Sequence, residues 1–227
     1  MVVLRSLAFA FVFYVVGALL VVAAAFEALV SRRAAHDGAR RWSAFFLWAS
    51  SRIAGVRLEV VGAVPSGPVI VAMKHQAAYE TMAVPRLFRW PAVVMKAELM
   101  RIPVWGWIAR RHGSIPVDRD ASSAAMRTML RVAEQAVAEG REIVIFPEGT
   151  RTPVGEAPPL KPGVSGLYKL MKLPVVPVAL DSGTLWPRRS FWKRPGTITM
   201  RFGEAIPAGL DRKTFEARLH AAINEEP

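Results

Sequence analysis

Two short stretches of the sequence carry side chains that could perform acid–base and phosphate chemistry. The first, KHQAAYE, covers residues 74 to 80 and places a histidine five residues before a carboxylate. On one continuous helix, five residues would rotate the two side chains by roughly 140° from each other, so they could not meet. We therefore expect His75 in a loop after a strand and Glu80 in the first turn of the next helix. A carboxylate that orients an imidazole in this way is typical of a general base.

The second stretch, FPEGTRT, covers residues 146 to 152 and follows an apolar run typical of a strand. Gly149 can take a positive φ at low cost, so we expect a tight turn with Glu148 and Arg151 on either side of it. The carboxylate could accept a hydrogen bond from a substrate hydroxyl, while the guanidinium holds a phosphate through two charged hydrogen bonds. A surface ion pair between the two side chains is the simpler alternative.

Two further motifs accompany these stretches. In GSIPVDR, residues 113 to 119, a short predicted strand ends at Arg119, which could bind phosphate or lie in solvent. In LPVVPVAL, residues 173 to 180, Pro177 removes one backbone donor from an otherwise apolar strand. Because proline cannot donate to a strand ladder, we expect this strand at an edge of the sheet or lining a site, and not at the centre.

The residue types that the chain lacks narrow the chemistry. It has no cysteine, which excludes disulfides, thiolate nucleophiles and thiolate metal sites. Its four histidines lack the H-E-x-x-H spacing of a zinc-binding helix, and we expect no metal. The G-x-S-x-G motif of serine hydrolases is missing too. The sequence thus offers a candidate base but no protein nucleophile for it to activate. We therefore expect the attacking hydroxyl to belong to the substrate and the reaction to be a transfer and not a simple hydrolysis.

The pattern from Val56 onward predicts the scaffold that must position these residues. Short apolar segments, mostly bounded by Gly or Pro, are strand candidates at residues 56–62, 68–74, 92–96, 114–118, 142–147, 174–180 and 197–202. Apolar residues at helical spacing predict one helix over Ser122 to Glu139 and another over Asp211 to Ile223. We expect a single mixed-sheet α/β domain, flanked by helices, over residues 56–227.

An apolar segment precedes this domain. Leu7 to Phe26 contains no charged residue and is long enough for a helix of roughly 30 Å, about one hydrocarbon thickness. We expect residues 1–55 to form a membrane anchor and an interfacial helix, with a signal peptide or a buried core helix as alternatives to the anchor. Arg5 precedes the segment and four arginines follow it, which places the domain at the cytoplasmic face of the cell inner membrane. The stretch from Arg40 to Gly55 could lie among lipid headgroups or pack on the domain.

The charge balance indicates anionic partners. The formal net charge is +12, which suits an anionic membrane, a phosphorylated substrate or an acidic carrier protein. Nucleic acid would explain the charge but not the apolar segment, and we do not expect it as a partner.

In their order along the chain, the four motifs resemble those of the glycerolipid acyltransferase superfamily, which contains the 1-acyl-glycerol-3-phosphate acyltransferases. The resemblance covers residues 69 to 180, and the ordered set is far more specific than any single motif. It implies that His75, oriented by Glu80, is the base that activates an acceptor hydroxyl. It also implies substrate-binding roles for two groups of residues: Arg119, Glu148, Gly149, Thr150 and Arg151 at the acceptor phosphate and glycerol, and Val175, Val176 and Pro177 near the acyl donor or substrate pocket.

The resemblance further implies a membrane-bound O-acyltransferase without a cofactor. The acyl group would pass from acyl-coenzyme A or an acyl carrier protein to a lysophospholipid acceptor, 1-acyl-glycerol-3-phosphate, and form phosphatidic acid. Another lysophospholipid, a lyso-ornithine lipid or glycerol-3-phosphate are alternative acceptors. A non-catalytic membrane module that binds lipid or carrier protein is an alternative of a different class. The chain departs from the family at Glu80, where aspartate is usual, and the loop must accommodate one more methylene.

One segment near the C-terminus mixes aromatic and basic residues. Thr184 to Gly196, TLWPRRSFWKRPG, holds three aromatic and four basic side chains. We expect it at the bilayer surface or where the acyl donor docks, with a solvated hairpin as the alternative.

Overall fold

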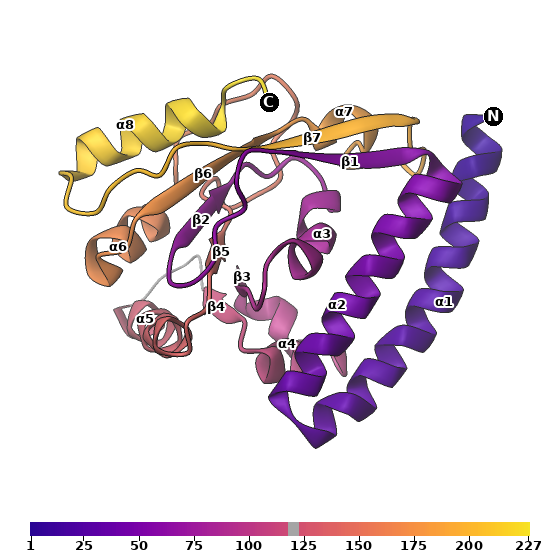
Figure 1. Cartoon of the computed structure of the whole chain (residues 1–227), viewed down its shortest axis with the longest axis horizontal. Coiled ribbons are helices and arrows are strands. Elements are labelled where there is room, and N and C mark those ends of the chain that lie inside the picture. Colours follow the sequence, from indigo (N-terminus) through magenta and orange to yellow (C-terminus); the bar gives the residue numbers. More distant parts are fainter. Residues whose placement is uncertain (118–122) are drawn as a thin grey trace.

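A seven-stranded sheet lies at the centre of the computed structural model, which describes residues 1–117 and 123–227 (Figure 1). The strands are β1 (Val56–Val61), β2 (Ile70–Met73), β3 (Ala92–Lys96), β4 (Ile115–Val117), β5 (Ile143–Ile145), β6 (Val175–Leu180) and β7 (Gly196–Phe202). Their order across the sheet is β1-β7-β6-β2-β5-β3-β4. All neighbours are parallel except β6 and β7, so the sheet is mixed. Each predicted strand is present, which confirms the α/β class.

Helices cover both faces of this sheet. They are α1 (Val2–Val30), α2 (Arg32–Ala49), α3 (Tyr79–Leu87), α4 (Trp105–His112), α5 (Ser123–Ala138), α6 (Pro162–Met171), the short α7 (Ser182–Leu185) and α8 (Arg212–Ile223). Of the helices predicted within residues 56–227, the one that follows the His75 loop is α3, and the two predicted from apolar spacing are α5 and α8. Helix α8 begins after Asp211, whose side chain accepts a hydrogen bond of 3.0 Å from the backbone N–H of Thr214 and so caps the first turn.

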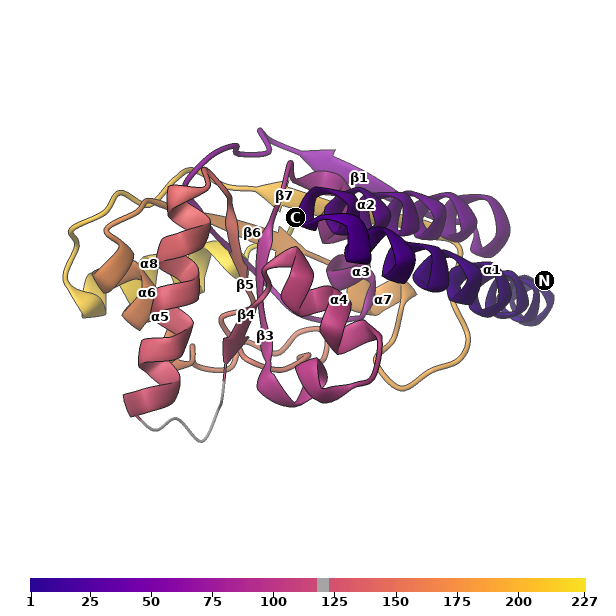
Figure 2. The same ribbon diagram turned by 90° about the horizontal axis from the view of Figure 1, so that it is seen from below.

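The core has two parts because successive strand residues point to opposite faces of a sheet. On β2, Val71 belongs to the apolar cluster that contains Phe46 of α2, and Ile70 belongs to the cluster that contains Phe215 of α8. Figures 1 and 2 show the resulting layers, with α1, α2 and α3 on one side of the sheet and α5, α6 and α8 on the other. A fully buried Phe side chain contributes roughly 1.5–3 kcal/mol, so the helices on both faces stabilise the sheet that carries the strand ends.

The expectation that the Pro177 strand lies away from the centre of the sheet is wrong. Strand β6 lies between β7 and β2, and Pro177 is in register with Ala72 of β2. Its carbonyl faces β7, where it accepts a 2.9 Å bond from the N–H of Gly203. Because β7 ends at Phe202 and pairing resumes only at an isolated bridge between Val175 and Ile206, the N–H that proline lacks falls in a gap of the ladder.

Helix α1 is attached to the domain at both ends. Near its start, Nε of Arg5 donates to the carbonyl of Ile53 at 2.9 Å, and near its end the carbonyl of Ala28 accepts from Nε of Arg111 at 3.0 Å. Phe9 lies in the same core cluster as Phe46, and α1 runs alongside α2 for most of its length (Figure 1). Among the described helices, α1 is the one that has the length and composition of a membrane span. The helix therefore belongs to the folded unit, although one of its faces is apolar and exposed.

That outer face carries large apolar side chains along the whole helix. Its exposed members are Val3, Leu4, Leu7, Phe11, Tyr14, Val15, Leu19, Val22, Phe26, Leu29 and Val30. The neighbouring helix α2 is different, because Phe46 is fully buried while Trp48 remains 54% exposed. Of the two alternatives for the stretch from Arg40 to Gly55, packing on the domain describes most of it, and Trp48 is the aromatic side chain left at the surface.

Candidate active site

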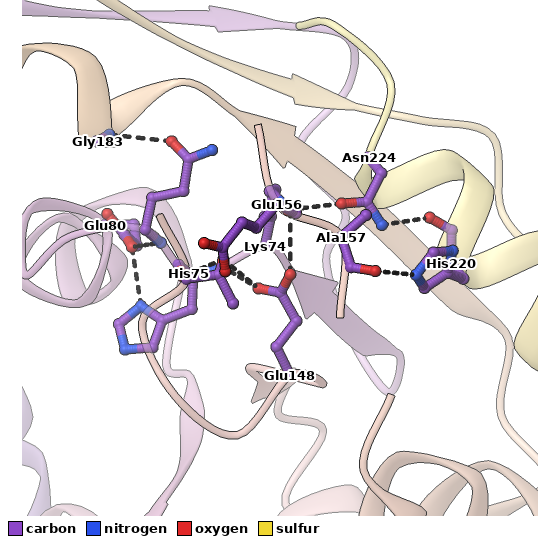
Figure 3. Close-up of polar contacts among 11 residues, drawn as sticks. Lys74, His75, Glu80, Glu148, Glu156, Ala157, Gly183, His220 and Asn224 are labelled. Carbon is purple, nitrogen blue, oxygen red and sulfur yellow. Dashed lines mark hydrogen bonds and ion pairs between the residues drawn. The ribbon is translucent and has the colours of Figure 1, made fainter. Parts of the chain in front are cut away.

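His75 and Glu80 meet at the carboxyl end of strand β2. His75 lies in the loop that follows the strand, and Glu80 is the second residue of α3. The distance between His75 Nδ1 and Glu80 Oε1 is 2.8 Å (Figure 3). This is the loop and first-turn arrangement that the five-residue spacing predicts. An imidazole whose Nδ1–H is donated to a carboxylate has its lone pair on Nε2, where it can accept a proton.

The carboxylate of Glu80 is held by three further donors. Its Oε1 accepts bonds from the backbone N–H groups of Gln76 at 2.8 Å and Ala77 at 2.7 Å, and its Oε2 accepts from the hydroxyl of Ser182 at 2.7 Å. The residue is fully buried. The loop thus closes around a glutamate side chain, and the extra methylene relative to aspartate costs no contact with the imidazole.

The imidazole of His75 is fixed on its face as well as at Nδ1. Its ring stacks on Phe146 with 4.2 Å between centroids and 27° between planes, and the side chain is 15% exposed. Phe146 directly follows β5, the strand beside β2 in the sheet. The ring is therefore oriented by two neighbouring strand ends, while part of it stays accessible.

The turn predicted around Gly149 is also present. Gly149 has a φ of +68°, and its N–H donates to the carbonyl of Phe146 at 2.9 Å. A Cβ at this position would lie 3.0 Å from Cγ of Lys161, so glycine is favoured by both the conformation and the space. Thr150 is exposed at the tip of the turn and Arg151 is partly buried beyond it.

Glu148 differs from the expectation that it faces a substrate hydroxyl or pairs with Arg151. It is 1% exposed, and its carboxylate binds other groups in the described part of the chain. Oε1 accepts from Nζ of Lys74 at 3.0 Å, and Oε2 accepts from the N–H of His75 at 3.0 Å and from the hydroxyl of Thr152 at 3.2 Å. Figure 3 shows the Glu148 carboxylate between the backbone of His75 and the side chain of Lys74. A carboxylate so deeply buried supports the loop and does not present an oxygen to a substrate.

The same turn binds the other side of the His75 backbone. The carbonyl of His75 accepts from the N–H of Thr152 at 2.7 Å and from its hydroxyl at 3.1 Å. Glu148 and Thr152 thus hold the N–H and the carbonyl of one residue. Because Arg151 immediately precedes Thr152, this clamp also fixes the backbone that carries the guanidinium relative to the imidazole.

A cleft of about 230 Å³ opens beside Arg151. Helix α1 supplies one wall, with Phe9, Phe13 and Tyr14, and the first turns of α3 reach it through Ala78 and Met82. Ala78 is the last residue of the loop that contains His75, so the cleft touches this loop at Ala78, while His75 and Glu80 are not among its lining residues. Its apolar walls suit a hydrocarbon chain.

The basic side of this cleft comes from the segment Thr184 to Gly196. Arg188 donates from Nη1 to the carbonyl of Arg151 at 2.8 Å, and Lys193 places its Nζ 4.7 Å from the centre of the Trp186 ring. Burial lowers the pKa of Lys193 below its usual value. Trp186 is 6% exposed. The segment is therefore anchored in the fold at its start, which disagrees with a freely solvated hairpin.

Beyond the anchored part, this segment presents apolar side chains to solvent. Phe191 is 48% exposed and Trp192 is 44% exposed, next to the exposed arginines 188, 189 and 194. Exposed aromatic residues among basic ones are typical of a surface that contacts lipid headgroups.

Some predicted site residues are not brought to this cleft. Arg119 lies outside the described residues. Pro177 is buried in the middle of the sheet with Val175 and Val176. The described residues contain no group of three or more His, Asp or Glu side chains that could hold a metal ion.

Sequence reasoning missed Lys74, Thr152 and Ser182. Lys74 and Thr152 stand beside motif residues, and adjacency to a motif is the signal that could have found them. Ser182 reaches Glu80 only because β6 lies next to β2 in the sheet and runs parallel to it. The segments that follow these two strands therefore begin at the same end of the sheet. That neighbourhood depends on the strand order and has no local signature.

Comparison with known proteins agrees with the geometry. A family model described as Acyltransferase matches residues 56–181. A 1-acyl-sn-glycerol-3-phosphate acyltransferase from Pseudomonas aeruginosa is 33% identical over 171 residues, which make up 74% of this chain and 66% of that protein. The human 1-acyl-sn-glycerol-3-phosphate acyltransferase beta is 30% identical over 142 residues, or 62% of this chain and 51% of the relative. The matched region thus spans between about half and two thirds of these relatives.

A solved structure has the same fold. The crystal structure of the 1-acyl-sn-glycerophosphate (LPA) acyltransferase PlsC from Thermotoga maritima matches with a TM-score of 0.75 and 20% sequence identity. The match covers 98% of this chain and 93% of the other. Helices α1 and α2 are therefore part of the shared architecture.

Proposed function

Because this chain belongs to the Acyltransferase family, we propose that it moves a fatty acyl group from an acyl thioester to the free hydroxyl of 1-acyl-glycerol-3-phosphate. The product is phosphatidic acid. The observation that carries the proposal is the 2.8 Å contact between His75 and Glu80, on a loop whose backbone is bonded to the turn that bears Arg151. The relatives' names support this acceptor.

In the proposed reaction, Nε2 of His75 takes the proton of the acceptor hydroxyl as its oxygen attacks the thioester carbonyl. Glu80 keeps Nδ1 protonated and stabilises the imidazolium that forms. The tetrahedral intermediate then collapses, the carbon–sulfur bond breaks, and the thiolate leaves and receives the proton from the imidazolium. One ester bond forms for each thioester bond broken, with no oxidation or reduction.

We assign phosphate binding to arginine. Arg151 lines the cleft next to the His75 loop, and its guanidinium suits a phosphate by charge and by its paired donors. Arg119 has the same role by its place in the motif order. Holding the headgroup fixes the hydroxyl relative to the imidazole, and orientation of this kind contributes several powers of ten to rate enhancements, on the order of 7–11 kcal/mol at its limit.

The other residues of the Glu-Gly-Thr-Arg turn have different roles in this scheme. Gly149 makes the turn possible, and Thr150 at the exposed tip is free to approach the glycerol. Glu148 holds the His75 loop by accepting a hydrogen bond from the backbone N–H of His75, and it does not touch substrate. The apolar cleft between α1 and α3 takes hydrocarbon.

We place the enzyme at the cytoplasmic face of the inner membrane, with α1 lying in one leaflet. The bonds from Arg5 and to Ala28 keep α1 along the domain, so its exposed apolar face can enter lipid without the helix leaving the fold. Phe191 and Trp192 extend this surface toward the cleft. A lysolipid acceptor could then reach the cleft directly from the bilayer.

The test is acyl transfer by the purified protein in detergent or liposomes, followed by lipid analysis. Lysophosphatidic acid should be converted to phosphatidic acid with acyl-coenzyme A or acyl carrier protein, and His75→Ala should abolish the product. If a lyso-ornithine lipid or glycerol-3-phosphate is turned over in preference to lysophosphatidic acid, that compound is the acceptor and the proposed acceptor is wrong. Binding of lysolipid without transfer to any acceptor would identify a non-catalytic module.

A further inference from the structure

A buried lysine lies directly before the proposed base. Lys74 is 5% exposed, and its Nζ donates to three acceptors (Figure 3). These are Oε1 of Glu148 and the carbonyl of Glu156, both at 3.0 Å, and Oδ1 of Asn224. The ammonium group has three donors, so each one has a partner. A side chain placed in this way does not face the substrate cleft, and its function must be exerted through its partners.

The third partner connects the site to the C-terminal helix. Asn224 follows the last residue of α8 and donates from Nδ2 to the carbonyl of His220 at 2.7 Å. His220 in turn bonds to the carbonyl of Ala157 at 3.1 Å through Nε2. Figure 3 shows the end of α8 meeting the chain at Glu156 and Ala157, with the Lys74 ammonium between them and Glu148. The helix end and this loop together form the acceptor set for Nζ.

The path from Lys74 to the imidazole consists of one side chain. Glu148 binds Lys74 with Oε1 and the N–H of His75 with Oε2. Because a carboxylate is planar and rigid, the ammonium that fixes one oxygen also fixes the other. The backbone of Lys74 continues the pairing of β2 with β6 by one residue, since its N–H donates to the carbonyl of Val178 at 2.9 Å. Lys74 therefore restrains His75 in two ways. Its backbone, which is bonded to β6, fixes the start of the His75 loop, and its ammonium fixes the Glu148 carboxylate that binds the N–H of His75.

Electrostatics makes this restraint depend on both charges. The Glu148 side chain is fully buried, and an ionised carboxylate in such a place is stable only when it is paired and hydrogen-bonded. Lys74 is the charged partner among its described contacts. Without the ammonium, the carboxylate would rotate toward water or become neutral, and in both cases its bond to the N–H of His75 would weaken.

We propose that Lys74 is a positioning residue for His75, and that Asn224 at the end of α8 seats the Lys74 ammonium for this task. The proposal rests on the acyl transfer proposed above, in which His75 is the base. It assigns the C-terminal helix a role in the geometry of a site whose motifs all lie between residues 69 and 180.

Kinetics of four variants test the proposal. Lys74→Met should lower kcat at least about tenfold with little change in KM, because a displaced base slows the chemical step and leaves binding intact. Asn224→Ala should lower kcat several-fold, whereas Asn224→Asp keeps an oxygen at the ammonium and should retain activity. Lys169→Met changes an exposed lysine on α6 and should behave as wild type. Equal kcat for Lys74→Met and wild type would overturn the proposal.

A double variant covers the case in which Lys74→Met does not fold. Lys74→Met combined with Glu148→Gln removes both charges together, so no unpaired carboxylate remains in the interior. This protein should fold, and it should have a lower kcat than wild type because a neutral amide holds the N–H of His75 less firmly. Wild-type kcat in the folded double variant would contradict a positioning role.

A measurement without substrate separates this proposal from the proposed function. The chain has four histidines, so a protein labelled with ¹⁵N-histidine gives few NMR signals, and His75→Ala identifies those of His75. Because Lys74 directly precedes His75, any substitution of Lys74 shifts the backbone amide of His75, so only the ring signals of His75 report on Lys74→Met and its double variant. These ring signals should shift in both variants, Asn224→Ala should shift the ring signals and the backbone amide, and Lys169→Met should shift neither. Unmoved ring signals of His75 would refute the link even if acyl transfer is found. Shifted ring signals in a protein that transfers no acyl group would support the link while the proposed function fails.

Discussion

The hydroxyl of Ser182 donates a 2.7 Å hydrogen bond to Oε2 of Glu80, across 102 residues of sequence. Ser182 is fully buried at the start of the short helix α7, which follows β6. Glu80 already orients His75 with its other oxygen. The proposed catalytic pair is thus part of a group of three side chains, and the third comes from a part of the chain outside the four motifs.

Ser182→Ala should therefore lower activity without touching substrate. Loss of one hydrogen bond to a buried carboxylate corresponds to about 1–2 kcal/mol, or a fall in kcat of roughly 5–30-fold, with KM nearly constant. Steady-state kinetics with lysophosphatidic acid would measure it. Thr197→Ala, which removes an exposed hydroxyl on β7, is the matched control. A kcat unchanged by Ser182→Ala would show that Glu80 does not need this donor.

The length of Glu80 can be tested separately from its charge. Glu80→Gln keeps the size but weakens the stabilisation of the imidazolium, and kcat should fall by about 100-fold or more. Glu80→Asp keeps the charge and shortens the side chain by one methylene, and kcat should fall by about tenfold because the shorter side chain withdraws from His75 or from the N–H groups of Gln76 and Ala77. Full activity of Glu80→Asp would mean that the loop readjusts to the shorter acid.

Arg151 should affect recognition of the phosphate more than the chemical step. Arg151→Gln should raise KM for lysophosphatidic acid by roughly 10–100-fold, the equivalent of one charged hydrogen-bond pair, and Arg151→Lys should lie between. A neutral monoacylglycerol, assayed in parallel, should show little difference between the variants. Arg218→Gln on the exposed face of α8 controls for a general loss of positive charge. If both acceptors lose the same factor, Arg151 does not read the phosphate.

Two buried histidines should make the stability of the fold sensitive to acid. His36 of α2 and His112 of α4 lie 3.4 Å apart, Nδ1 to Nε2. Burial lowers the pKa of His112 to about 3, with the charge of Arg141 as the next cause. Burial also lowers the pKa of His36, aided by Arg40 and opposed by Asp37. Both rings are therefore neutral in the folded protein at pH values where the unfolded chain protonates them.

The sign of the effect follows from proton counting. Between the usual histidine pKa of 6.5 and about 3, the unfolded chain binds the extra proton on residue 112, so the free energy of unfolding falls as pH falls. The slope is about 1.4 kcal/mol per pH unit once the unfolded ring is fully protonated. His112→Gln lacks this group, so its stability does not fall for this reason when the pH is lowered from 7 to 5, whereas that of the wild type does. The variant should be less stable at pH 7, and its urea midpoint should approach that of the wild type toward pH 5. A constant difference over this range would contradict the prediction.

The aromatic tip of the segment Thr184 to Gly196 should contribute to lipid binding. Phe191→Ala with Trp192→Ala removes the exposed rings and should reduce sedimentation with anionic liposomes. Changing the exposed arginines 188, 189 and 194 to Glu should reduce it further, and the effect should shrink at high salt because surface charges are screened. Thermal unfolding followed by circular dichroism serves as the control for folding, because Arg188 and Phe191 also line the cleft. Unchanged liposome binding in both variants would remove this segment from the membrane surface.

The sequence predicts the strands of this fold well because their signals are local. Each strand candidate is a short apolar run, most of them bounded by Gly or Pro, and each one is observed. The position of Glu80 relative to His75 also follows from local geometry, since a helix cannot bring those two side chains together and a loop before the helix can.

What the sequence does not predict is which strand lies beside which. Pro177 looks like an edge residue from its missing donor alone, and only the early end of β7 explains its place inside the sheet. Glu148 looks available to a substrate until the packing of Lys74 and Thr152 around it is known. Ser182 and Asn224 approach the site from 102 and 150 residues away, and such contacts depend on the folded topology.

The attachment of α1 affects how a soluble version of this enzyme could be made. Deleting an N-terminal apolar helix is a common route to a protein that needs no detergent. Here the deletion would remove Phe9, Phe13 and Tyr14 from one wall of the cleft and uncover Phe46 in the core behind it. Replacing outward-facing residues such as Phe11, Leu19 and Phe26 by polar ones would keep the inner face intact. Solubility and an intact substrate site therefore call for redesign of the outer surface of α1 and not for its truncation.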